Sequence, residues 1–127
     1  MANEPNASLA GLRLLVVEDE YMVAELLCFL LERFGCTVVG PFADVAEAIT
    51  AVQTQPIDGA LLDANLHGKS SAPVAQALAT AGVPFVLATG YGGLALDDPI
   101  LDQAARINKP FNGAELEAVM LAVFRRA

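Results

Sequence analysis

The sequence is poor in basic residues. Lys and Arg together number 7 against 15 Asp and Glu, which gives a formal net charge of −8 at pH 7. The only two basic residues that adjoin each other are Arg125 and Arg126, near the C-terminus. A nucleic-acid-binding domain normally carries a basic face, so this balance argues against direct DNA binding.

Cysteine and histidine are also scarce. Cys28, Cys36 and His67 do not have the spacing of a Cys/His metal site. Cys28 falls in an apolar helical pattern and Cys36 stands near the start of a strand, so both are predicted to be reduced core residues. His67, the single histidine, is interpreted as a solvated loop residue.

Long apolar runs are missing. No run reaches the ~18 residues that a membrane-spanning helix needs. The N-terminal stretch MANEPNASLAG lacks the basic start and long apolar segment of a secretion signal. We therefore expect a cytoplasmic protein without a membrane segment. Hydrophobic residues occupy 55% of the 127 positions, which suits one domain with its own core. Residues 1–10 are predicted to be a polar tail and residues 11–127 the folded domain.

Short apolar runs alternate with segments of helical periodicity along the whole chain. The predicted strands are Leu12–Val17, Cys36–Val39, Ile57–Leu62, Val83–Ala88 and Ala105–Asn108. The first predicted helix has a buried stripe of Val23, Leu26, Leu27, Leu30 and Phe34, and Gly35 ends it. Later helices are predicted from Asp44 to about Gln53, over Ser71–Thr80 and Leu94–Ala104, and from Asn112 onward. Pro99 disfavours the fourth of these, and the pairs Asp44/Glu47 and Asn112/Glu115 resemble capping boxes.

Five successive β-α units indicate an α/β fold with a parallel sheet and helices on both faces. Periodicity does not give the strand order. In a flavodoxin-like (βα)5 topology of order 2-1-3-4-5, the first and third strands are neighbours, and ligands bind beyond the carboxyl ends of the strands.

Polar side chains stand where the predicted strands end. They are Glu18, Asp19 and Glu20 after the first strand, Asp63 after the third, Thr89 after the fourth and Lys109 after the fifth. Clustered carboxylates raise one another's pKa, and Mg²⁺, which prefers oxygen ligands, relieves that conflict. Asp63 is then suited to attack phosphorus as a carboxylate nucleophile. Mg²⁺, the Lys109 ammonium and the Thr89 hydroxyl would stabilise the charge of the transferred group.

The segments VVEDE, LLDANLHG, ATG and NKPF resemble the receiver domain of two-component response regulators, from about Leu12 to the C-terminus. The resemblance implies a phosphoacceptor that catalyses its own phosphorylation and slow dephosphorylation, and is not an enzyme in the usual sense. Asp63 would accept the phosphoryl group, and Thr89 and Lys109 would contact it. The implied Mg²⁺ ligands are Asp19 and Asp63 through their side chains, Asn65 through its backbone carbonyl and Glu18 through water.

The stretch FVLATGYGG, with Asn65-Leu66 and Gly82-Val83-Pro84 upstream, is similar to the "FATGUY" subclass of receivers, in which many members are single-domain. That likeness implies a stand-alone regulator, phosphorylated by a sensor histidine kinase of the HWE or HisKA2 type or by a histidine phosphotransfer protein. Leu87 departs from the motif. Arg106 replaces the switch aromatic that most receivers carry three residues before the lysine, and Tyr91 is predicted to take a related role.

Other functions remain open at this point. A haloacid-dehalogenase-like phosphatase would use Asp19 as its nucleophile, in a D-x-D motif that this chain replaces with E-D-E. An FMN-binding flavodoxin would need a Ser/Thr/Gly-rich loop where this chain is acidic. A pseudo-receiver would lack the complete acceptor set. The output is equally open: a phosphate sink, a phosphorelay or allosteric contact with a partner.

Overall fold

A sheet of parallel strands runs through the computed structural model, which describes residues 8–90 and 98–124. Its strands are β1 (Arg13–Val17), β2 (Thr37–Phe42), β3 (Gly59–Asp63), β6 (Phe85–Thr89) and β7 (Ala105–Asn108). They lie side by side in the order β2-β1-β3-β6-β7, and each neighbouring pair is parallel. Because β6 and β7 are the fourth and fifth predicted strands, the flavodoxin-like order 2-1-3-4-5 is confirmed.

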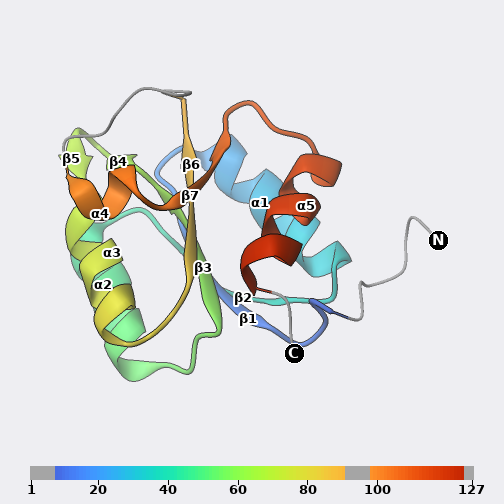
Figure 1. Cartoon of the computed structure of the whole chain (residues 1–127), viewed down its shortest axis with the longest axis horizontal. Coiled ribbons are helices and arrows are strands. Elements are labelled where there is room, and N and C mark those ends of the chain that lie inside the picture. Colours follow the sequence, from blue (N-terminus) through green and yellow to red (C-terminus); the bar gives the residue numbers. More distant parts are fainter. Residues whose placement is uncertain (1–7, 91–97, 125–127) are drawn as a thin grey trace.

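Helices cover both faces of the sheet (Figure 1). On one face lie α1 (Tyr21–Arg33) and α5 (Gly113–Phe124); on the other lie α2 (Val45–Thr54), α3 (Ala72–Thr80) and α4 (Pro99–Asp102). Each face has its own cluster of buried apolar side chains, so the sheet is buried on both sides. Within the described residues, no helix has the length and apolar character needed to cross a membrane.

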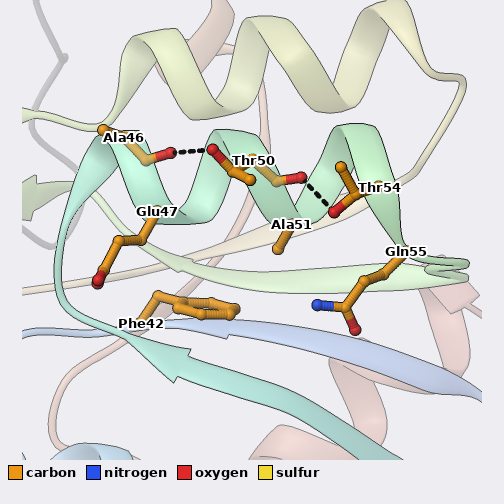
Figure 2. Close-up of a pocket in the computed structure, with 7 residues that line it drawn as sticks. All are labelled: Phe42, Ala46, Glu47, Thr50, Ala51, Thr54 and Gln55. Atoms are coloured by element: carbon orange, nitrogen blue, oxygen red, sulfur yellow. Dashed lines mark hydrogen bonds between the residues drawn. The ribbon is translucent and has the colours of Figure 1, made fainter.

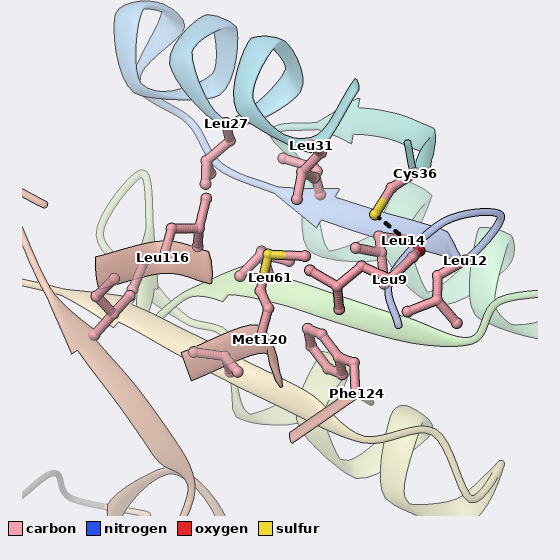
Figure 3. Close-up of a cluster of buried hydrophobic side chains, with 14 residues drawn as sticks. Leu9, Leu12, Leu14, Leu27, Leu31, Cys36, Leu61, Leu116, Met120 and Phe124 are labelled. Carbon is pink, nitrogen blue, oxygen red and sulfur yellow. Dashed lines mark hydrogen bonds between the residues drawn. The ribbon is translucent and has the colours of Figure 1, made fainter. Parts of the chain in front are cut away.

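One of these clusters lies under α1 and α5 (Figure 3). Leu27 and Leu31 of α1 and Met120 of α5 point onto Leu14 and Leu61 of the sheet. Cys36 is buried there, as predicted, and its thiol donates to the backbone oxygen of Leu9 at 3.5 Å. Cys28 was predicted to be a core residue as well, but it is only half-buried.

The outer face of α1 is more apolar than the sequence pattern predicts. Leu26, assigned above to the buried stripe, is 41% exposed, and the buried residues of this helix are Ala24, Leu27 and Leu31. The run of consecutive apolar residues around Leu26 and Leu27 made both seem to share one face, whereas the helix turns by ~100° per residue.

Local signals set the helix ends. After α1, Gly35 adopts a positive φ of 89°, and the Cys36 amide donates to the Leu31 oxygen, as in a Schellman motif. Before α5, the Asn112 amide donates to Glu115 Oε1 and the Glu115 amide to Asn112 Oδ1, so the predicted capping box is complete.

The fourth helix is shorter than predicted. Pro99 begins α4 instead of interrupting it, because a proline suits the first helical position. The Asp98 carboxylate caps the helix by accepting from the Ile100 amide at 3.0 Å. The helix ends at Asp102, and the predicted residues 94–97 lie outside the described part of the chain.

A small hairpin after β3 was not predicted. Strand β4 (Asn65–Leu66) pairs antiparallel with β5 (Lys69–Ser70). The turn between them places His67 at φ 51° and Gly68 at φ 80°, the two positive values that a type I′ turn requires. Strands of two residues leave no periodicity to detect, which explains the omission.

We expect Gly59→Ala to destabilise the protein. A Cβ at residue 59 of β3 would lie 2.7 Å from two ring atoms of Phe124 and 3.0 Å from Leu14 Cδ2, so the Phe124 ring must shift out of a packed core. Overpacking of this kind costs about 1–3 kcal/mol of unfolding free energy, measurable by urea denaturation. Phe124→Leu, made in the Gly59→Ala background, should recover part of the loss; additive losses in the double variant would contradict the proposed clash.

Candidate functional site

The strand register brings the predicted polar residues to one edge of the sheet. Val17 is level with Leu62 in the neighbouring strand, Asp63 is level with Ala88, and Thr89 is level with Asn108. The chain continues from these ends into Glu18 after β1 and Lys109 after β7. The Lys109 amide donates to the Thr89 oxygen at 2.9 Å, which extends the pairing of β6 and β7 by one residue.

Lys109 lies at the centre of this edge, within reach of three carboxylates. Its Nζ is 2.9 Å from Glu18 Oε1, 3.2 Å from Asp63 Oδ2 and 3.5 Å from Glu20 Oε1. The Glu18 side chain is completely buried, and those of Asp63 and Lys109 are largely buried. The sequence therefore predicted correctly that residues 18, 63 and 109, far apart along the chain, meet at one place.

Asp63 resists ionisation in the metal-free protein. Burial raises the pKa of its carboxyl group, and the neighbouring Glu18 carboxylate raises it further; the Asn65 amide and the Lys109 ammonium only partly oppose them. The result is a pKa of about 7. The pKa of Lys109 is also raised. Burial lowers the pKa of the ammonium, but the contacts with Glu18 and Asp63 raise it by more.

Asp19 is held by the β4–β5 hairpin. The His67 amide donates to Asp19 Oδ2 at 2.8 Å, and His67 Nδ1 lies 3.6 Å from the same oxygen. Burial raises the pKa of Asp19, yet the hydrogen bonds with His67 and Asp63 outweigh it and the pKa is lowered. The His67 side chain is 66% exposed, as expected for a loop residue, but its backbone has a defined partner.

The remaining predicted residues lie close by or outside the described chain. Thr89 ends β6 with 1% exposure. Asn65 begins β4, and its amide donates to Asp63 Oδ1 at 3.2 Å. Arg106 lies on β7 and contacts α4: its Nη2 is 2.8 Å from the Asp102 backbone oxygen and 3.7 Å from Asp102 Oδ1. Tyr91 lies outside the described residues.

Glu20 is the residue that the sequence reasoning missed. Its carboxylate belongs to the group of Glu18, Glu20 and Asp63 whose oxygens all lie within 4.8 Å of one another. The signal was present, because Glu20 completes an E-D-E run directly after a buried strand. The sequence analysis placed Glu20 at this edge but assigned it no role.

A divalent cation fits the chemistry of this edge. Glu18 Oε1 is buried and receives no well-formed hydrogen bond, although Lys109 Nζ is within ion-pair distance. Three carboxylates, from Glu18, Glu20 and Asp63, lie against the Lys109 ammonium, and the Asp19 carboxyl group is hydrogen-bonded with Asp63 beside them, so carboxylates outnumber the ammonium. Hard oxygen donors with excess negative charge are the ligands that Mg²⁺ selects.

The surface hollow drawn in Figure 2 lies away from this edge. It has a volume of about 350 Å³ and runs along α2 beside Phe42 of β2. The hydroxyls on its wall are already engaged: Thr50 Oγ1 donates to the Ala46 oxygen and Thr54 Oγ1 to the Thr50 oxygen. The reactive groups therefore gather at the sheet edge and not in this hollow.

Comparison with known proteins identifies the family to which the chain belongs. Residues 14–121 match the response regulator receiver domain family. The chain belongs to this family, and its function is therefore that of a phosphoryl acceptor in a response regulator.

Several relatives share its sequence over most of the chain. It is 37% identical over 122 residues to the DNA-binding response regulator MtrA of Mycolicibacterium paratuberculosis, an alignment covering 90% of this chain and 52% of MtrA. The chain thus spans about half the length of that curated relative. Among solved structures, SdrG from Sphingomonas melonis Fr1 is 37% identical with a TM-score of 0.78, covering 91% of this chain and 97% of that one. The BeF3-activated conformation of SdrG, from Pseudomonas melonis Fr1, is 38% identical with a TM-score of 0.70, covering 88% and 98%.

Asp63→Asn should stabilise the metal-free protein increasingly as the pH rises. The folded pKa of Asp63, about 7, exceeds its unfolded value of 3.8, so the folded state holds this proton more strongly. Wild-type stability from this group is therefore present below pH ~4 and is lost as the pH rises through 7. Asn carries no titrating group. Urea denaturation in the presence of chelator, at pH 5 and at pH 8, measures the difference in unfolding free energy between wild type and Asp63→Asn. A difference that is the same at both pH values would contradict the raised pKa.

Proposed function

We propose that this protein accepts a phosphoryl group from a histidine kinase onto Asp63, in a reaction that depends on Mg²⁺. The observation that carries the proposal is the placement of Asp63 at the end of β3 with Lys109 Nζ 3.2 Å from its carboxylate. The nucleophile and the cation that would receive the phosphoryl oxygens are thus already adjacent.

The residues at the sheet edge have distinct parts in the proposed reaction. An oxygen of the Asp63 carboxylate attacks phosphorus; the bond from phosphorus to the donor's leaving atom breaks, and its electron pair departs with that atom. Lys109 leaves its ion pair with Asp63 to contact the phosphoryl oxygens, and Thr89, at the end of the adjacent strand, donates its hydroxyl to them.

Asp19 and Asp63 would hold Mg²⁺ through their side chains, Asn65 through its backbone carbonyl and Glu18 through water. When bound, the ion supplies positive charge against the carboxylates and the phosphoryl oxygens. Asp19 is already oriented by the His67 amide, and Asp63 Oδ1 by the Asn65 amide. These two hydrogen bonds support Asp19 and Asp63 as direct ligands.

The output of the proposed regulator passes through protein contact or onward phosphotransfer. A net charge of −8 supports a regulator that acts without contacting DNA itself, although relatives such as MtrA are named DNA-binding regulators. We place it in the cytoplasm, where a kinase of the HWE or HisKA2 type, or a histidine phosphotransfer protein, would supply the phosphoryl group. A phosphate sink without further output is the alternative.

Arg106 is the proposed link between the site and its output surface, together with Tyr91. Arg106 lies on β7, three residues before Lys109. Its guanidinium donates to the backbone oxygen of Asp102, the last residue of α4, and so links β7 to α4. Movement of Lys109 toward a phosphoryl group would therefore shift β7, and through Arg106 it would also shift α4. The existence of a BeF3-activated conformation of SdrG supports a conformational response in this chain too.

Phosphorylation should map to Asp63 and should require a divalent cation. Incubation with phosphoramidate and Mg²⁺, followed by borohydride reduction and peptide mass spectrometry, should identify residue 63. Chelator should prevent the modification, and renewed Mg²⁺ should restore it. Asp63→Asn should show no label, with Asp58→Asn, on an exposed loop of the same chain, as the matched control. Label at Asp19 instead would favour a phosphatase of the haloacid-dehalogenase type and contradict the proposal.

Arg106→Ala should loosen α4 without disturbing the sheet. The variant loses the hydrogen bond to the Asp102 oxygen, worth about 1 kcal/mol. The amides of Asp102 and Gln103, which close the helix, should therefore exchange with solvent about fivefold faster. Hydrogen exchange followed by NMR measures this, with the β3 amides as the internal reference. Unchanged exchange in α4 would show that Arg106 does not hold this helix.

A further inference from the structure

Glu20 stands at the start of α1 but does not serve that helix. It occupies the N-cap position, yet its side chain makes no capping hydrogen bond, although the cap is where side-chain acceptors are normally used. Its amide donates to Glu18 Oε2 at 3.1 Å, and its own carboxylate turns toward Lys109 Nζ at 3.5 Å. The side chain therefore belongs to the acceptor site.

The two glutamates that contact Lys109 differ in depth. The Glu18 side chain is fully buried and that of Lys109 is 16% exposed, whereas Glu20 is 66% exposed. Glu20 thus lies on the solvent side of Lys109, where a phosphodonor must enter. In an in-line displacement the leaving group is on the far side of phosphorus from the nucleophile. Glu20 is the most exposed of the four carboxylates described at this edge, so a leaving group that departs toward solvent passes close to it.

We propose that Glu20 determines donor specificity: it favours donors with a P–N bond whose nitrogen-containing group is protonated and disfavours anionic acyl phosphates. The inference rests on the proposed function, because it concerns transfer to Asp63. A carboxylate beside the leaving group attracts a cationic nitrogen and repels a departing carboxylate. Phosphoimidazoles, the N–P donors of histidine-based phosphotransfer, belong to the favoured class when the ring nitrogen remote from phosphorus is protonated.

Two small donors separate these cases. In phosphoramidate, Asp63 attacks phosphorus, the P–N bond breaks, and its electron pair stays on a nitrogen that is already protonated and leaves as neutral ammonia. In acetyl phosphate, the P–O bond breaks and its electron pair leaves with acetate, which carries a negative charge past Glu20. Both reactions form the same aspartyl phosphate and involve no oxidant or further reactant.

The test compares Glu20→Gln with Glu32→Gln, both carried by full-length protein at saturating Mg²⁺. Glu32 is an exposed glutamate at the other end of α1, about 18 Å away along the helix, so its removal changes the net charge equally but lies beyond the screening length of about 10 Å at 0.1 M salt. The measurement is the second-order rate constant for phosphorylation by each donor, followed by the formation of Asp63 phosphate.

Glu20→Gln should raise the acetyl phosphate rate constant relative to that of phosphoramidate by about three- to tenfold, the range expected for one unit charge at a solvent-exposed contact. The shift in this ratio should shrink as salt increases, and Glu32→Gln should leave the ratio unchanged. Taking the ratio removes any effect of Glu20 on metal affinity or folding, since both donors use the same protein.

Two outcomes would overturn the inference. If Glu20→Gln changes both rate constants by the same factor, Glu20 does not discriminate between donors. If Glu32→Gln shifts the ratio as much as Glu20→Gln, the effect comes from net charge and not from the site. A wild-type protein that neither donor modifies at Asp63 would instead refute the proposed function itself, which keeps the two failures distinguishable.

Discussion

The buried ion pair between Glu18 and Lys109 is the interaction on which the site depends. A carboxylate with no exposed surface is costly to ionise, and Lys109 at 2.9 Å makes the charge tolerable. The same ammonium contacts Asp63. Lys109 therefore both compensates the buried charge of Glu18 and takes part in the chemistry of Asp63. Because Lys109 follows β7 and Glu18 follows β1, the pair also joins elements from the two ends of the chain.

Burial, together with the neighbouring Glu18 carboxylate, explains why the pKa of Asp63 is raised to about 7 when no cation is bound. The nucleophile is thus restrained by the same neighbours that would bind a divalent ion. The charge imbalance adds to the effect of burial at this edge of the sheet. It can be relieved by protonation, by a cation or by loss of a carboxylate, and each of these alters the reactivity of Asp63.

Much of the fold could be predicted because the parallel sheet is buried on both faces. Its strands appear as unbroken apolar runs, and each run ends in a residue whose polarity has no role in packing. Asp63, Thr89 and Lys109 were recognisable for that reason. Leu26 was assigned to the wrong face because the consecutive apolar residues 26–31 obscure the helical period. The β4–β5 hairpin was too short to give a pattern, and the contact of Glu20 with Lys109 depends on a side-chain direction that no spacing encodes.

The His67–Gly68 turn has a consequence for the thermodynamics of ligand capture. By fixing the backbone between Asp63 and α3, the hairpin gives up the conformational entropy of that loop during folding instead of at the moment of binding. The Asp19 carboxylate is already oriented by an amide of this hairpin. An incoming cation would then bind to a site that is already arranged and would release hydration water. The affinity for the cation would therefore depend on ionic strength and pH far more than on ordering of the chain.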